Sequence, residues 1–280
     1  MKWDNEFEEI PVIDFHTHAF PTKIAQPAVD QLSSHYKLSV ARPGTLQDLL
    51  DCAREAGVIK ICLHAAATSA EQVEPTNNWI AQQCSDFIIG FGSLHVEYKD
   101  FPTELVRMKS MGLTGIKFHA DFQGFAIDDR RMWPVYEAIG DRFLVMFHVG
   151  DRESDLSNPA RLGRVLDNFP GLRVIAAHLG GWSRWQEAKD HILGRDVYID
   201  TSSTTWVLPP EEVAALIRAH DTERVLFGTD YPIVAHRQEL NAFARVPLTR
   251  EEREKILWKN AARLLGLAGC GIDKAVGNLG

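Results

Sequence analysis

The sequence has few cysteines and no long apolar run. Four cysteines occur among 280 residues, and none forms a CxxC pair, which argues against a disulfide framework and against a thiolate metal site. No apolar stretch approaches the roughly 18 residues of a membrane-spanning helix. The polar segment 1–9 lacks the basic and apolar regions of a secretory signal. We therefore expect reduced thiols, a cytoplasmic location and no membrane partner.

The charge pattern also excludes some partners. The formal net charge is -8, and no run of like charge forms a binding tail. Nucleic acids and anionic membranes bind surfaces with clustered lysine and arginine, so neither is expected as a partner. No GxGxxG sequence follows an apolar run, which disfavours a dinucleotide-binding fold. A small-molecule substrate is the expected partner.

Short apolar runs alternate with amphipathic runs along the chain. Apolar runs bounded by glycine, proline or charge are typical of strands buried on both faces, and alternation with helices indicates parallel strands. Eight such runs in a chain of this length predict a single-domain (β/α)8 TIM barrel over residues 1–280. The predicted strands are 10–15, 58–63, 87–91, 114–118, 143–147, 172–176, 197–200 and 224–227.

Five helices are predicted from capping residues and terminating glycines or prolines. Thr45 caps the first, and Asn158 followed by Pro159 begins another. The segment 19–43 is too long for a simple connection, and we expect a loop or a short helix over the barrel mouth. The predicted helices cover 45–56, 102–111, 158–169, 210–219 and 249–265.

The histidines are concentrated at the strand ends. The carboxyl ends of barrel strands form the face that carries active sites. Burying so much imidazole without a cation would leave many polar groups to satisfy, so the set as a whole indicates a metal site. Of the eleven histidines, seven lie at or just after the end of a predicted strand: His16, His18, His64, His95, His119, His148 and His178.

The first strand ends in His16-Thr17-His18. Residues two apart on a strand share a face, so both imidazoles point into the barrel and can share one cation. Asp14 shares this face but lies deeper. We expect it to support the ligands by accepting a ring N–H and so fixing a tautomer.

Asp230 follows the last predicted strand, which neighbours the first strand in a closed barrel. Its carboxylate can bind the cation and accept a proton from bound water. With His148 at the end of the fifth strand, the ligand set becomes three histidines and one aspartate. This set predicts one divalent ion, with Zn²⁺ first and Mn²⁺, Fe²⁺ or Co²⁺ as alternatives.

Other polar residues at the strand ends each have alternative roles. His178, after the sixth strand, is a ligand of a second metal, a core residue, or a group that polarises the substrate, and we rank the last role first. His119 is a candidate substrate contact. Lys117 is a buried ion-paired lysine, an anion anchor or a bridging ligand, and Arg152 is a candidate substrate contact or a solvated loop charge. Trp182, Trp185 and Trp206 line the mouth or pack against the helices.

In combination, these residues resemble the motifs of the amidohydrolase superfamily, and specifically those of the branch that contains decarboxylases and lactone hydrolases. The resemblance runs along almost the whole chain, and its stretches are 12–18, 115–119, 147–150, 157–159, 177–181 and 228–232. It implies a divalent metal held by His16, His18, His148 and Asp230, and a catalytic histidine at His178. Lys117 and His119 occupy the position where two-metal members carry a bridging ligand, so one ion is expected and a second is left open.

The predicted function is hydrolysis of a lactone, ester or amide in a small, carboxylated molecule. Metal-activated water would attack the carbonyl, Asp230 would transfer the proton, and His178 would stabilise the oxyanion. The first alternative is non-oxidative decarboxylation of an aromatic or dienoic acid. The second is a metal-binding protein without catalysis. Such a protein is expected to hold its ion in a closed, cysteine-rich site, which disfavours this alternative. An exposed ring of helices would allow a homodimer.

Overall fold

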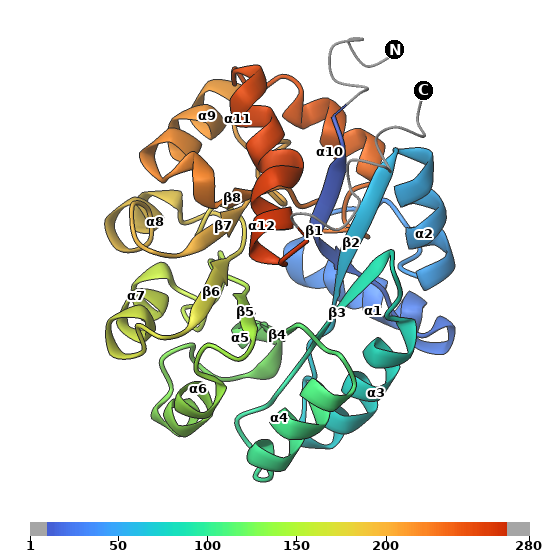
Figure 1. Cartoon of the computed structure of the whole chain (residues 1–280), viewed down its shortest axis with the longest axis vertical. Helices are drawn as coiled ribbons and strands as arrows, with labels where there is room; N and C mark the ends of the chain where they lie inside the picture. The colour runs from blue at the N-terminus through green and yellow to red at the C-terminus, as the bar shows by residue number, and fades with distance from the viewer. Residues whose placement is uncertain (1–9, 268–280) are drawn as a thin grey trace. The chain divides into compact units, whose positions relative to one another are not determined.

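A computed structural model describes residues 10–267 of the chain. Within this range, eight strands form one sheet whose neighbours follow the chain order from β1 to β8, which the colours of Figure 1 trace. The pairs from β3 through β7 are parallel. This confirms the predicted (β/α)8 barrel. The strands are β1 (Val12–His18), β2 (Val58–His64), β3 (Ile88–Gly92), β4 (Gly115–Phe118), β5 (Leu144–Phe147), β6 (Arg173–Ala176), β7 (Tyr198–Asp200) and β8 (Val225–Leu226).

The helices alternate with these strands. Thr45 caps α2 by accepting a hydrogen bond from the Asp48 amide, and Asn158 caps α7 through the Ala160 amide, as predicted. No helix in residues 10–267 is long and apolar enough to span a bilayer. The α-helices are α1 (Thr22–Tyr36), α2 (Leu46–Glu55), α3 (Val73–Gln83), α4 (Phe101–Ser110), α5 (Ala120–Gln123), α6 (Trp133–Ile139), α7 (Pro159–Asn168), α8 (Trp185–His191), α9 (Pro210–Ala219), α10 (His236–Phe243), α11 (Arg250–Glu254) and α12 (Asn260–Leu264).

Three predicted elements differ from the structure. Strand β1 begins at Val12 and continues through His18, so both histidines of the HxH pair lie within the strand. The segment 19–43 is neither a loop nor a short helix, because α1 spans 15 residues and contains Pro27, which removes one helix hydrogen bond. The predicted helix 249–265 contains a π-helical turn, Lys255–Lys259, between α11 and α12.

The chain separates into two compact units. The first unit combines Met1–Ile61 with Thr201–Gly280, and the second unit is Cys62–Asp200. The prediction of a single domain over 1–280 stays a prediction, and residues 1–9 and 268–280 lie outside the described range.

The core of the second unit is built on strands that are buried on both faces. All residues of β4 and β5 are buried, including the lysine of β4, Lys117. Phe118 stacks on Phe147 with 5.4 Å between ring centroids, and Tyr136 of α6 contacts both rings edge-on. The Tyr136 hydroxyl donates to the Ile127 carbonyl at 2.7 Å, so its polar atom is satisfied inside the core. This cluster fixes the ends of β4 and β5, after which His119 and His148 follow.

Candidate functional site

In the first unit, β1 lies beside the segment that follows β8. The Asp230 amide donates to the His16 carbonyl at 2.8 Å, and the His18 amide donates to the Tyr231 carbonyl at 2.7 Å. This pairing confirms that the Asp230 segment neighbours the first strand. His16 is fully buried, and Asp230 is 7% exposed. Their side chains, with that of His18, form a group whose ligand atoms lie within 4.8 Å of one another.

The three donor atoms form a compact triangle. Nε2 of His16 lies 3.1 Å from Nε2 of His18, and each of these nitrogens lies 3.5 Å from Oδ1 of Asp230. Ligands at about 2.1 Å from one ion, at angles between about 90° and 110°, are about 3.0–3.4 Å apart. The residues present therefore fit a divalent metal ion. The triangle comes from two strand ends, which explains why the HxH spacing alone could not specify it.

Two serines after β7 contact the atoms of His16 and Asp230 that point away from the triangle. The Ser202 hydroxyl lies 2.9 Å from Nδ1 of His16, and the Ser203 hydroxyl donates to Oδ2 of Asp230 at 2.7 Å. Both serines are buried. Nε2 of His16 and Oδ1 of Asp230 are the atoms that face the triangle, so the serines contact the atoms on the other side of each ligand.

Gly228 makes room for this arrangement. A Cβ atom there would lie 2.7 Å from Cβ of His16 and 3.2 Å from Cβ of Ser202. Real Cβ atoms essentially never approach another carbon at 2.7 Å, and both neighbours are anchored close to the backbone. The glycine of the Gly228-Thr229-Asp230 sequence is thus required by close packing against the metal-ligand side chain.

Asp14 supports the two strand ends through their backbones. Its Oδ1 accepts hydrogen bonds from the amides of His16 (3.0 Å) and Thr229 (3.1 Å), and its Oδ2 accepts from the Thr229 hydroxyl (2.6 Å). The ring nitrogen near Asp14 is Nε2 of His236, at 3.1 Å, while the ring contact of His16 is with Ser202. Asp14 thus contacts the backbone of His16, and its role in fixing the tautomer of a ligand histidine stays a prediction.

His236 is a buried cation at the start of α10. Burial opposes its charge, but the Asp14 carboxylate and the Cys52 thiol outweigh this cost and raise the pKa of His236 to about 9. Nδ1 of His236 lies 3.3 Å from Sγ of Cys52. Burial tends to raise the pKa of Cys52, yet the hydrogen bond from His236 and the charge of Arg42 leave it below its ordinary value. A chain of contacts thus runs from Cys52 through His236 and Asp14 to the backbone of the metal ligands.

In the second unit, the strand register brings three histidines together. Phe118 of β4 pairs with Phe147 of β5, which pairs with Ala176 of β6. The rings of His119 and His148, which follow these positions, stack with centroids 3.9 Å apart. Nε2 of His178 lies 2.9 Å from Nδ1 of His148. The sequence predicted these residues at the strand ends, and parallel register explains their proximity.

The carbonyl of Gly150 determines the tautomer of His148. It lies 2.8 Å from Nε2 of His148 and can only accept, so Nε2 carries the proton and Nδ1 has the lone pair. Gly150 has φ +89, and a Cβ there would lie 2.3 Å from the Trp182 carbonyl oxygen. Glycine is thus needed for the turn that aims this carbonyl. The Nδ1 lone pair of His148 faces Nε2 of His178 at 2.9 Å, so His148 can bind a metal through Nδ1 only when this contact is given up.

A second group with metal-ligand chemistry consists of His119, Asp121 and His148. Oδ2 of Asp121 lies 3.9 Å from Nδ1 of His119 and 4.0 Å from Nε2 of His148. The two rings are nearly parallel, at 9°, so their in-plane lone pairs do not converge on one point. Nε2 of His148 is also bonded to Gly150. Burial raises the pKa of Asp121, against the opposing effect of the Ser157 and Ser154 hydroxyls.

The backbone of His178 is strained and firmly held. His178 and Leu179 have φ of +63 and +51, in the left-handed region that disfavours residues other than glycine. The His178 amide donates to Oδ1 of Asp200 at 3.2 Å, and the Trp185 indole donates to the His178 carbonyl at 3.0 Å. Trp185 therefore contacts a candidate catalytic residue directly.

The remaining polar residues at the strand ends are hydrogen-bonded or packed within the fold. Both ring nitrogens of His95 are bonded, one to the Gln123 carbonyl and one to the Glu97 amide, which fits a structural role. The ring of His64 packs on Phe91, with 4.3 Å between centroids. Lys117 is fully buried within β4. Among the three candidate substrate contacts, Lys117 is thus enclosed in the sheet, and His119 is stacked on His148.

Arg152 lies in the loop between β5 and α7 and is exposed. Its guanidinium lies 5.0 Å from the ring centre of Trp182. No carboxylate of the described residues pairs with Arg152 in the ion pairs of the structure. Trp182 itself is buried and Trp206 is 38% exposed, so the three tryptophans differ in their surroundings.

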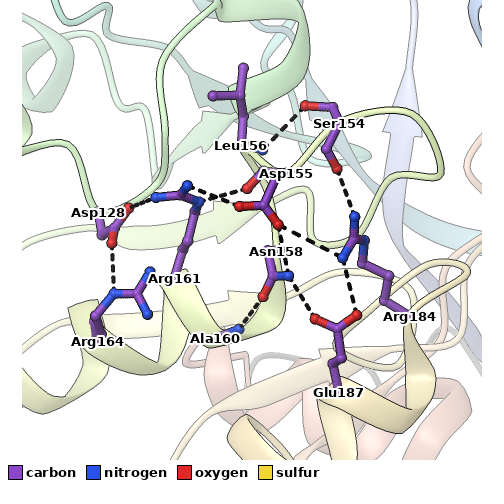
Figure 2. Close-up of polar contacts among 10 residues, drawn as sticks. All are labelled: Asp128, Ser154, Asp155, Leu156, Asn158, Ala160, Arg161, Arg164, Arg184 and Glu187. Carbon is purple, nitrogen blue, oxygen red and sulfur yellow. Dashed lines mark hydrogen bonds and ion pairs between the residues drawn. The ribbon is translucent and has the colours of Figure 1, made fainter.

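A polar network holds this loop to the neighbouring helices, and Figure 2 shows its contacts. Arg184 donates to the carbonyls of Asp151 and Ser154 and pairs with Glu187 at 3.0 Å. Arg161 pairs with Asp155 of the same loop at 2.9 Å. Because both arginines bind loop backbone or side chains, the segment after His148 is fixed at several points along its length.

Sequence reasoning missed Ser202, Ser203, His236 and Cys52. The hydroxyl-rich segment after β7, Thr201-Ser-Ser-Thr-Thr205, carried a signal, because it occupies the same kind of strand end as the histidines. No sequence signal joined His236 or Cys52 to Asp14, because these residues meet only through packing of the first unit.

A protein family and a curated protein both match this chain. The family model described as Amidohydrolase matches residues 13–267. A curated relative, the 2-amino-3-carboxymuconate-6-semialdehyde decarboxylase of Caenorhabditis elegans, is 28% identical over 125 residues. That match covers 38% of this chain and 31% of the relative, so the chain matches about a third of that protein's length.

Solved structures share the fold. A dihydroxybenzoic acid decarboxylase from a Polaromonas species, with bound manganese and an inhibitor, has a TM-score of 0.72 at 19% identity, over 92% of this chain and 98% of that one. A probable 2-pyrone-4,6-dicarboxylic acid hydrolase from Acinetobacter baumannii, with bound citric acid, has a TM-score of 0.67 at 17% identity, over 91% and 99%. At these identities the likeness shows the fold alone.

Proposed function

The chain belongs to the amidohydrolase family, and from this premise we propose that it is a metal-dependent enzyme that decarboxylates a small aromatic or dienoic acid without oxidation. The observation that carries the proposal is the triangle of Nε2 of His16, Nε2 of His18 and Oδ1 of Asp230. The sequence favoured hydrolysis first and decarboxylation second, and the proposal places decarboxylation first. The relative from Caenorhabditis elegans and the Polaromonas structure are both named as decarboxylases, which favours this reaction.

One divalent ion is proposed at the triangle, with His148 as a fourth ligand on the strength of the family pattern. When bound, the ion would act as a Lewis acid toward a substrate oxygen or a water molecule. Zn²⁺ suits two imidazoles and a carboxylate, and Mn²⁺ is the ion in the Polaromonas structure. A second ion is not part of the proposal, because the stacked rings of His119 and His148 do not converge.

Decarboxylation needs a proton donor at carbon. The substrate carboxylate leaves as carbon dioxide, its bonding electrons stay on the carbon, and one proton replaces the lost group. We assign this donor to His178, because its ring can exchange a proton and its backbone is held in a strained conformation by Asp200 and Trp185. Asp230 is the second proton-transferring group in the proposal.

Arg152 is the proposed contact for the substrate carboxylate. It is exposed, has no carboxylate partner among the described residues, and lies over Trp182. Arginine binds carboxylates with two parallel hydrogen bonds, so a free guanidinium in the loop after His148 suits an acidic substrate. Lys117 is less suitable because it is enclosed within β4.

Hydrolysis of a lactone is the second candidate. The same three donor atoms suit it, and the Acinetobacter structure named as a probable 2-pyrone-4,6-dicarboxylic acid hydrolase has nearly the same coverage and a similar TM-score. In this reaction Asp230 would accept a proton from water and later return it to the leaving oxygen.

The test is a substrate screen on protein reconstituted separately with Zn²⁺ and Mn²⁺. Hydroxybenzoates and dienoic acids are assayed for carbon dioxide release, and lactone dicarboxylates for ring opening. Carbon dioxide release that disappears in His16→Ala, together with its bound ion, would support decarboxylation. Ring opening without carbon dioxide release would establish the hydrolase instead, and full activity in His16→Ala would refute the metal centre.

A matched pair of variants tests Arg152. Arg130 also lies over a tryptophan, with its guanidinium 3.8 Å from the ring of Trp133. Arg152→Gln should raise KM for an acidic substrate by about 10-fold or more, the cost of losing a charge-assisted contact. Arg130→Gln should leave KM unchanged. Equal effects of the two substitutions would contradict the role of Arg152.

A further inference from the structure

We propose that Ser202 and Ser203 are positioning residues, which determine the atoms that His16 and Asp230 present to the metal. This inference depends on the metal centre of the proposed function. The loop after β7 carries two adjacent hydroxyls, and each of them contacts one metal-ligand side chain.

Ser202 selects the ring nitrogen of His16. An imidazole that binds a metal through Nε2 carries its proton on Nδ1, and that proton needs an acceptor. The Ser202 hydroxyl lies 2.9 Å from Nδ1, and both residues are fully buried. A buried hydroxyl at this position stabilises the tautomer whose lone pair is on Nε2, the atom 3.1 Å from Nε2 of His18.

Ser203 selects the oxygen of Asp230. A carboxylate can rotate and bind an ion through either oxygen, or through both. The Ser203 hydroxyl donates to Oδ2 at 2.7 Å, which leaves Oδ1 directed at the two histidines, 3.5 Å from each. The hydrogen bond therefore favours one carboxylate rotamer and monodentate binding.

The backbone explains how adjacent serines serve one centre. Successive side chains of an extended segment point to opposite faces, so two neighbours would not normally reach the same site. Ser203 has φ +50, a left-handed conformation that is costly for a residue other than glycine. This turn lets both hydroxyls reach ligands, and Gly228 provides the space in which Ser202 approaches His16.

The same loop provides a matched control. Thr205 is buried, and its hydroxyl donates to Oε1 of Glu239 at 2.5 Å, away from any proposed ligand. Thr205→Val removes a buried hydroxyl at nearly constant volume. It reports what the loss of a loop hydrogen bond does to the fold without changing a contact of the metal ligands.

The experiment measures Zn²⁺ affinity by competition with a chromogenic chelator, and the visible spectrum of Co²⁺-loaded protein. Ser202→Ala and Ser203→Ala should each weaken Zn²⁺ binding by about 10- to 100-fold, the usual effect of removing a group that orients a ligand. The Co²⁺ spectrum should change in both. Thr205→Val should bind Zn²⁺ within about 3-fold of wild type, and Ser203→Gly, which lacks the hydroxyl but adopts φ +50 without strain, should weaken binding as Ser203→Ala does.

The outcomes separate this inference from the metal centre itself. If wild type binds no Zn²⁺, or His16→Ala binds it normally, the proposed function fails. If wild type binds Zn²⁺ and both alanine variants bind within about 3-fold of Thr205→Val, only the role of the serines is refuted. If Ser203→Ala does not fold, Ser203→Gly decides, because a folded glycine variant that binds Zn²⁺ within about 3-fold of Thr205→Val and keeps the Co²⁺ spectrum would overturn the role of the Ser203 hydroxyl.

Discussion

Replacing Asp14 by asparagine should expose how strongly the buried charge of His236 depends on its partner. The substitution keeps the size of the side chain and one carbonyl oxygen for the amides of His16 and Thr229. It removes the negative charge 3.1 Å from Nε2 of His236. Without that charge, burial dominates and His236 must become neutral at pH 7.

The cost follows from the pKa of His236. Its rise from 6.5 to about 9 is a stabilisation of the charged form that the folded protein supplies. At about 1.4 kcal/mol for each pKa unit, this amounts to about 3 kcal/mol. Breaking one partner of a buried pair typically costs about 3–5 kcal/mol, so Asp14→Asn should lower the free energy of unfolding by about 3 kcal/mol.

The assay is urea denaturation at pH 7 of chelator-treated protein, so that metal binding adds nothing to stability. Glu254→Gln is the control, because Glu254 pairs with the exposed Arg250 and Lys259 in the same unit and its loss should cost about 1 kcal/mol or less. The double variant Asp14→Asn, His236→Gln should lose about 2 kcal/mol less than the sum of the single variants, because no unpaired charge remains.

Two results would refute this reasoning. A loss in Asp14→Asn no larger than that in Glu254→Gln would mean that the buried pair contributes little. Additivity of the two single substitutions within about 0.5 kcal/mol would mean that Asp14 and His236 are not coupled, whatever their separation in the structure.

Three further predictions concern pH and packing. The folded pKa of His236 is raised, so the stability that its charge gives the folded protein is complete below about pH 6.5 and is lost as the pH rises through about 9. Urea denaturation should show this loss of stability, and His236→Gln should remove it. Gly228→Ala should destabilise the protein by about 1–3 kcal/mol and weaken Zn²⁺ binding in chelator competition, whereas Gly171→Ala, with no atom within 4 Å of the new Cβ, should do neither. Asp121 has a pKa raised by burial, so its ionisation costs stability as the pH rises above 4; Asp121→Asn should therefore raise the urea midpoint at pH 8 more than at pH 4.

The sequence predicted the elements whose pattern is local. Apolar runs of four to six residues cannot satisfy their backbones alone, so they indicated buried parallel strands, and capping residues such as Thr45 and Asn158 marked helix starts. It failed for α1, because a proline such as Pro27 is a local signal against a helix, yet it lies inside a 15-residue helix.

The histidine pattern was the most informative part of the candidate site. The period of two along a strand placed His16 and His18 on one face, and their Nε2 atoms lie 3.1 Å apart in the structure. The order of the strands placed the Asp230 segment beside β1, which the pairing of Thr17 with Tyr231 confirms. The catalytic roles of His178 and Asp230 stay predictions.

The sequence by itself thus determined the presence and order of the eight strands, the shared face of His16 and His18 and the choice of ligand chemistry, because these follow from backbone periodicity and side-chain identity. Only the tertiary structure decided which atoms of those ligands face one another. That depends on contacts between residues far apart in the chain, such as Ser202 with His16 and Asp14 with His236. Tautomers and carboxylate rotamers differ by single hydrogen bonds, and no local pattern in a sequence specifies the partner that forms them.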